Sequence, residues 1–80
     1  MDLNKEFLEK YNDLMNEDVE KALNFSINCL KESNNPDFYA YIADCYMSLE
    51  DYDNSIQTLK LALNENCNNI SFVKSLLGEI

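Results

Sequence analysis

Histidine, arginine and tryptophan are absent from this chain, which has one glycine and one proline. Histidine is the commonest general base and metal ligand, and glycine-rich loops are what cradle phosphate groups. A G-x-S-x-G nucleophile motif is also missing from the sequence. We therefore expect a protein that is not an enzyme and that holds no cofactor and no metal.

Positive charge is scarce as well. Fifteen Asp and Glu residues stand against six Lys, which gives a formal net charge of -9 at pH 7. This balance repels phosphate backbones and anionic membrane surfaces, so we expect neither nucleic acid nor a membrane as a partner. Apolar runs stay well short of the roughly 18 residues that span a bilayer, and the first residues lack the apolar centre of a signal peptide. We therefore expect a cytoplasmic protein.

Two kinds of metal ligand are present, but neither forms a recognisable site. Cys29, Cys45 and Cys67 include no C-x-x-C pair, so we expect small apolar side chains rather than a zinc site or a disulfide framework. Asp51 and Asp53 lack the glycine and distal Glu of a calcium-binding EF-hand loop. Because the helix dipole favours carboxylates at helix starts, we expect these two residues to begin a helix.

Helix is the expected secondary structure throughout. The apolar residues recur with helical spacing rather than with the alternation of strands, and few glycines or prolines interrupt them. The five apolar clusters occupy residues 7–15, 19–30, 39–46, 52–63 and 72–80. We expect Tyr39, Tyr46 and Tyr52 to face the core. Asn35 and Pro36 suit a helix start, and the short joints between clusters predict antiparallel neighbours.

The segment 36–69 carries the most specific pattern in the chain. Small, aromatic and aliphatic residues stand at fixed offsets across it, at Tyr39, Ile42, Ala43, Tyr46, Ser55, Leu59, Ala62 and Cys67. This pattern resembles the tetratricopeptide repeat (TPR), in which small residues such as Ala43 and Ser55 mark the place where two helices cross most closely. The resemblance implies an all-α fold, a right-handed stack of antiparallel helical hairpins (a TPR-like α-solenoid) of about two repeats plus a terminal helix.

The remainder of the chain resembles the same repeat less closely. Ala22 stands 33 residues before Ser55, and Tyr11 takes an offset where the repeat has Gly or Ala. Leu77 and Gly78 resemble the Leu-Gly of a further repeat. We therefore expect one module over residues 1–80. Its parts would be a degenerate repeat at 1–34, a repeat at 36–69, and at 70–80 the first helix of a third repeat or a capping helix.

The resemblance also implies a function in protein–protein interaction. In TPR arrays the first helices of successive hairpins line a concave groove that holds extended peptides. The off-core positions that would face such a groove are Asn12, Asp37, Ala40, Tyr41, Asp44, Met47, Ser48 and Ser75. Asp37 and Asp44 make this groove acidic, and Tyr41 and Met47 make it partly apolar. Complementarity then favours a basic or basic-apolar peptide or partner helix.

Two other functions stay open at this point. An apolar stripe runs along the last cluster, at Phe72, Leu76, Leu77 and Ile80. An exposed stripe of this kind marks an interface, so the chain could be a self-associating structural unit, a homodimer through its last helix. Alternatively, the chain could be the N-terminal regulatory TPR segment of a longer protein. Whether the gene continues past residue 80 would test the second alternative.

Overall fold

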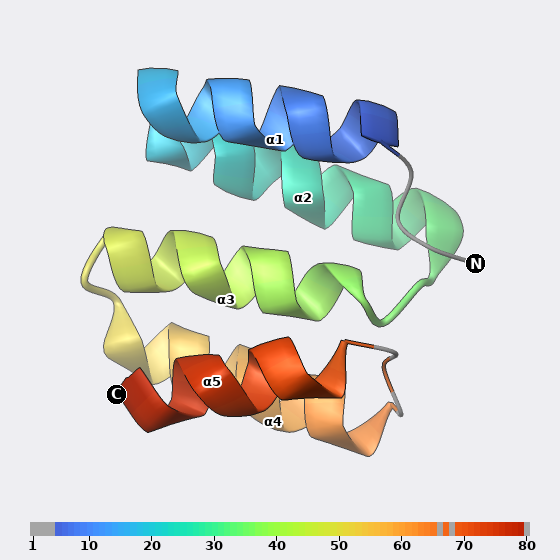
Figure 1. Ribbon diagram of the computed structural model, residues 1–80, viewed down its shortest axis with the longest axis vertical. Helices are drawn as coiled ribbons and strands as arrows, with labels where there is room; N and C mark the ends of the chain where they lie inside the picture. The colour runs from blue at the N-terminus through green and yellow to red at the C-terminus, as the bar shows by residue number, and fades with distance from the viewer. Residues whose placement is uncertain (1–4, 66, 68, 80) are drawn as a thin grey trace.

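In a computed structural model of the chain, residues 5–65, 67 and 69–79 are described, and they form five helices (Figure 1). The helices are α1 (Lys5–Glu17), α2 (Val19–Ser33), α3 (Phe38–Ser48), α4 (Tyr52–Asn64) and α5 (Ile70–Glu79). These described residues include no strand, so the predicted all-α class is confirmed. Within the same ranges, no helix has the length and apolar character needed to cross a membrane.

Consecutive helices run antiparallel to one another, as the short joints predict (Figure 1). In this view α1 lies over α2, α5 lies over α4, and α3 lies between the two pairs. Helix α3 packs most extensively against α4 and α2, while α5 packs against both α4 and α3. The alternate helices α1, α3 and α5 therefore run in the same direction.

Acidic residues cap the starts of α2 and α4. The Asp18 carboxylate accepts a hydrogen bond from the backbone N–H of Glu20 at 3.0 Å, and the Asp51 carboxylate accepts one from the N–H of Asn54 at 3.4 Å. Each bond satisfies a donor that has no partner inside its own helix. Asp51 and Asp53 thus begin a helix, as predicted. Nowhere in the described ranges do Cys, Asp or Glu side chains gather in a group that could hold a metal ion.

Two buried clusters form the core, and α3 contributes to both. The first core cluster, among α1, α2 and α3, comprises Phe7, Tyr11, Ala22, Phe38 and Cys45. The second core cluster, around α3, α4 and α5, comprises Ala40, Ala43, Leu59, Ala62, Cys67, Val73 and Leu76. Both combine large side chains with alanines, whose small size lets helices approach closely.

Small residues bring α3 and α4 together where the repeat pattern places them. Ala43 and Ser55 are both fully buried, and the Ser55 hydroxyl donates a hydrogen bond to the Ala43 carbonyl oxygen at 3.0 Å. So short a side chain reaches the backbone of a neighbouring helix only where the two helices are close. The bond also satisfies a hydroxyl that is shielded from water. Leu59, one turn further along α4, is fully buried as well.

The tyrosine at the start of α4 does not lie where the sequence predicts. Tyr52, expected to face the core, is 46% exposed. It is the first residue of α4, and its side chain belongs to neither core cluster. The prediction that Tyr52 faces the core is therefore wrong, although Leu59, two turns further along nearly the same direction of α4, is fully buried.

The apolar stripe of α5 is largely used inside the module. Leu76 is buried in the second core cluster, and Phe72 and Leu77 are half-buried and pack against it. Ile80, the fourth residue of the stripe, lies outside the described residues. Self-association through the last helix stays a prediction, but Leu76 is not part of an exposed stripe. The physical reason is that α5 contacts two helices, α3 and α4, and so needs a wider apolar face than one contact requires.

Replacement of Ala43 by Glu tests the crossing of α3 and α4. The larger side chain has no space there and its charge would be buried without a partner, so we expect a loss of at least about 3 kcal/mol in the free energy of unfolding. Thermal unfolding followed by circular dichroism measures the loss. Gln57→Glu, at an exposed position of α4, is the control. An unchanged melting midpoint for Ala43→Glu would contradict the crossing.

Replacement of Gly78 by Ala tests the open space around the end of α5. A Cβ added to Gly78 would meet no atom within 4 Å. Because alanine loses less backbone entropy than glycine on forming a helix, Gly78→Ala should raise the free energy of unfolding by about 0.5–1 kcal/mol. Urea unfolding measures the change. A lower stability in the variant would mean that Gly78 is closely approached by another part of the protein.

Candidate functional site

An aromatic side chain in the middle of α3 links it to both α1 and α5. The Tyr41 ring makes edge-to-face contacts with Phe7 and Tyr11 of α1, whose ring centroids lie 5.2 and 5.0 Å away. It also packs against Phe72 of α5, with 5.4 Å between centroids. Such pairs each contribute about 0.5–1.5 kcal/mol beyond the burial of apolar area. Tyr41 thus joins α1, α3 and α5 at one surface. We call this surface, which includes Tyr41 and Asp44, the three-helix face.

A buried tyrosine holds the carboxylate at the centre of the three-helix face. The Tyr11 hydroxyl donates a hydrogen bond to Asp44 Oδ2 at 2.7 Å, which joins α1 to α3. Burial, and then the bond to the Asp44 carboxylate, raise the pKa of Tyr11 far above its ordinary value. The phenol therefore stays protonated at physiological pH and remains a donor. Asp44 as a residue is half-buried, and the bond from Tyr11 holds its Oδ2 in place.

The cysteine beneath this pair is not a reactive thiol. Cys45 is fully buried, with its Sγ 4.0 Å from the Tyr11 hydroxyl oxygen and 3.7 Å from Met15 Sδ. Burial raises the pKa of the Cys45 thiol to about 11, although the Tyr11 hydroxyl opposes the shift. A thiol that is buried and protonated neither attacks a substrate nor binds a metal readily. Cys45 therefore has the role of a small core residue that the sequence predicts.

Two of the predicted groove residues are buried and cannot meet a ligand. Ala40 is fully buried in the second core cluster, because α5 and α4 pack on that side of α3. Asp37 is 4% exposed, and its backbone carbonyl oxygen accepts a hydrogen bond from Asn69 Nδ2 at 3.0 Å. Burial of Tyr41 is the main cause that raises its pKa, and the charge of Asp37 is the next. Asp37 therefore affects this surface through its charge rather than through contact with a ligand. The inclusion of Ala40 and Asp37 in a binding surface is therefore wrong.

The other predicted positions keep some contact with solvent. Asn12 of α1, Ser48 of α3 and Ser75 of α5 are exposed. Tyr41 and Asp44 are half-buried in the arrangement described above, and Met47 is half-buried against the second core cluster. The surface that remains is smaller and less acidic than the sequence predicts, with Asp44 as its central charge.

Sequence reasoning missed the role of Tyr11. The residue is noticeable only as a bulky side chain where the repeat has Gly or Ala. Its partner Asp44 lies 33 residues later, which is the spacing that also separates Ala22 from Ser55. In the repeat pattern, however, Tyr11 takes the position of Ala43, so Asp44 stands one residue beyond the matching position on the parallel helix α3. The spacing could therefore have indicated that Tyr11 lies near this part of α3, but not that it bonds to Asp44.

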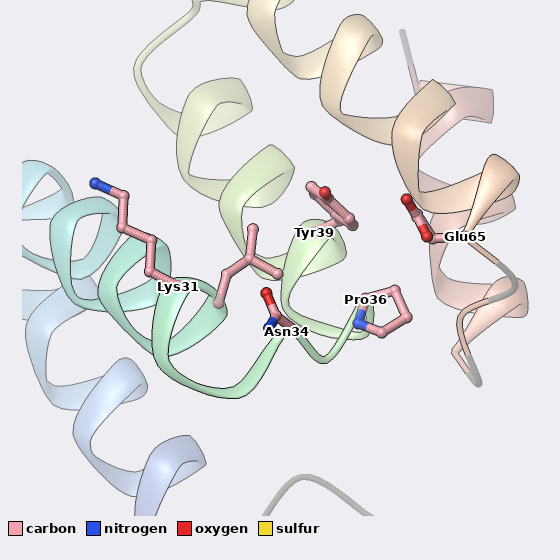
Figure 2. A pocket seen from close by; sticks show the side chains of 6 residues that line it. Lys31, Asn34, Pro36, Tyr39 and Glu65 are labelled. Carbon is pink, nitrogen blue, oxygen red and sulfur yellow. The ribbon is translucent and has the colours of Figure 1, made fainter.

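A hollow of about 340 Å³ lies elsewhere, where the end of α2, the start of α3 and the end of α4 meet (Figure 2). It is lined by Leu30, Lys31, Asn34, Pro36, Tyr39 and Glu65. Lys31 and Glu65 stand on opposite sides of Tyr39 in this view, and both of these charged residues are exposed. The hollow therefore has no set of converging, desolvated polar groups of the kind that fixes a small ligand.

Comparisons of the chain with protein-family models, with curated proteins and with solved structures find no match. The TPR resemblance therefore stays a prediction from the residue pattern.

Replacement of Tyr11 by Phe tests the bond between α1 and α3. Loss of a hydrogen bond to a carboxylate should cost about 1.5–3 kcal/mol at neutral pH. Because the folded-state pKa of Tyr11 is raised, the contribution of this residue to the free energy of unfolding is fully present below the unfolded-state pKa near 10. That contribution is lost as the pH rises above this value.

The pH dependence gives this test a second readout. Above pH 10 the stability of the wild type should fall more steeply than that of Tyr11→Phe, by up to about 1.4 kcal/mol per pH unit. Denaturant unfolding from pH 7 to 11 measures both effects, and Tyr52→Phe at an exposed position is the control. Parallel stability curves for wild type and Tyr11→Phe would contradict the buried phenol.

Proposed function

We propose that the protein is a TPR-like protein–protein interaction module that binds a peptide or a partner helix on its three-helix face. In this proposal the five helices are a right-handed stack of about two repeats plus a terminal helix. The observation that carries it is the contact of Tyr41 with rings from both α1 and α5. Those contacts support one continuous surface across alternate helices, which is where the family pattern expects a ligand.

The residues of this face favour a basic or basic-apolar ligand. Asp44 offers a carboxylate whose Oδ2 is fixed by Tyr11, so little side-chain entropy is lost when a cation binds it. Tyr41 and Met47 add partly exposed apolar surface beside it, and Asn12 and Ser75 can supply hydrogen bonds at the edges. The net charge of -9 adds long-range attraction for a basic segment.

We propose binding rather than catalysis because the side chains that usually carry out catalysis are absent or unreactive here. The sequence has no histidine, and its thiol on this face, Cys45, is buried and protonated. The Tyr11 hydroxyl, which could otherwise transfer a proton, has a pKa raised out of the useful range. What remains on the three-helix face is a set of groups that recognise a partner.

Removal of the central charge tests this proposal. Asp44→Asn keeps an oxygen that can accept the Tyr11 hydrogen bond but removes the negative charge. Titration of the variant with a labelled, proline-containing peptide of Lys and Leu, which cannot form a helix, should show binding weakened by about three- to tenfold, an effect that shrinks as salt shortens the Debye length below about 10 Å. Asp53→Asn makes the same change of charge at an exposed position of α4 and is the matched control.

Equal effects of the two substitutions would contradict the proposed site, because they would show attraction to the whole chain rather than to one face. Tight binding of an acidic peptide that does not respond to salt would contradict the proposed ligand class.

A further inference from the structure

We propose that one side of α4, next to its buried face, is a second docking surface, which takes an amphipathic helix with basic flanks from a partner protein. The surface consists of Tyr52, Ile56 and Leu63, and we call it the α4 stripe. Tyr52 is 46% exposed and Leu63 39% exposed, while Ile56 is half-buried without packing against either core cluster. These side chains are distinct from the three-helix face, so the inference does not rest on the function proposed above.

The three residues of the α4 stripe point in one direction. They stand at offsets of four and eleven residues from Tyr52, so at 3.6 residues per turn they lie within about 40° of one another around the helix. Along the axis they span about 16 Å. An apolar strip of that length and width matches the contact face of one packed helix.

The same stripe occurs on α2, where it is packed. Val19, Leu23 and Leu30 stand 33 residues before Tyr52, Ile56 and Leu63, in the same order. All three are half-buried and pack against the first core cluster, to which α3 contributes Phe38 and Cys45. On α2, apolar side chains of the neighbouring helices therefore cover the stripe. We expect a similar apolar helix face to cover the stripe on α4.

Helix α5 does not cover the stripe on α4. It packs through Val73 and Leu76 into the cluster that contains Leu59 and Ala62 of α4. Tyr52 and Leu63 stay outside that cluster and remain exposed. A helix-sized apolar strip beside α5 is therefore left open among the described residues.

The charge of the chain selects the occupant. A second copy would bring together two chains of net charge -9, which repel each other over a Debye length of about 8–10 Å. A basic helix is attracted instead. Asp53 and Lys60 flank the stripe on its exposed side and offset each other locally, so the attraction comes from the whole acidic chain. Hydrophobic contact with the stripe then supplies the specificity for one side of α4.

Two leucines of α4 provide a matched test. Leu63 belongs to the stripe, whereas Leu61 is 47% exposed on nearly the opposite side of the same helix. Leu63→Lys and Leu61→Lys make the same change of size and charge. The probe is a labelled peptide of about 20 residues that places Leu on one helical face and Lys on its flanks, and its affinity for the full chain is measured by fluorescence anisotropy.

We expect Leu63→Lys to weaken binding by at least about tenfold and Leu61→Lys by less than about threefold, since only Leu63 loses apolar contact with the peptide. A peptide of the same composition with its leucines out of helical register should bind weakly to the wild type and to both lysine variants. Circular dichroism checks that both variants stay folded. Asp44→Asn, on the three-helix face, should weaken binding no more than Asp53→Asn does.

Three results would overturn the proposal. Equal weakening by the two lysine substitutions would mean that the peptide responds only to net charge. Equal binding of the out-of-register peptide would mean that no helix is recognised. A dimer in sedimentation that Leu63→Lys dissociates would identify a second copy as the occupant instead of a basic helix.

Discussion

Helix α3 is apolar on nearly every side, and the other four helices pack around it. Phe38 and Cys45 belong to the first core cluster, while Ala40 and Ala43 belong to the second. A helix that is buried on several sides needs small residues where its neighbours come closest, and the buried Ser55 hydroxyl bonded to the Ala43 carbonyl oxygen marks one such place. Without this crossing the two halves of the core would have no shared element.

The same burial explains why the three-helix face is narrow. Once α3 has packed against α2, α4 and α5, the part of α3 that reaches solvent on the three-helix face is a strip through Tyr41, Asp44 and Ser48, at offsets of three and seven residues. Such a strip is one helical stripe wide. A ligand that needs more contact must therefore also use α1 and α5, which Tyr41 holds beside α3. The central helix thus limits the face and also positions it.

The sequence allows the helices and the α3–α4 crossing to be predicted, because both follow from local spacing. Ala43 and Ser55 are small at fixed offsets, and an apolar period identifies each helix. The surface of α3 was harder to predict, since periodicity gives the direction of a side chain but not the number of helices around it. Ala40 looked like a groove residue and is buried, because a third neighbour, α5, packs there. Tyr11 and Asp44 likewise meet only through the packing of two helices distant in sequence.

The open apolar surface lies on α4 rather than on α5 for a related reason. The sequence alone indicates no partner for the stripe of large side chains in the last apolar cluster, yet α5 uses Val73 and Leu76 against two helices at once. Besides the faces that pack against α3 and α5, helix α4 has a further apolar face. The counterpart of that direction on α2 is packed against the first core cluster, while Tyr52 and Leu63 are exposed. The open surface is therefore found by comparing the two stripes that stand 33 residues apart, because burial depends on neighbours as well as on composition.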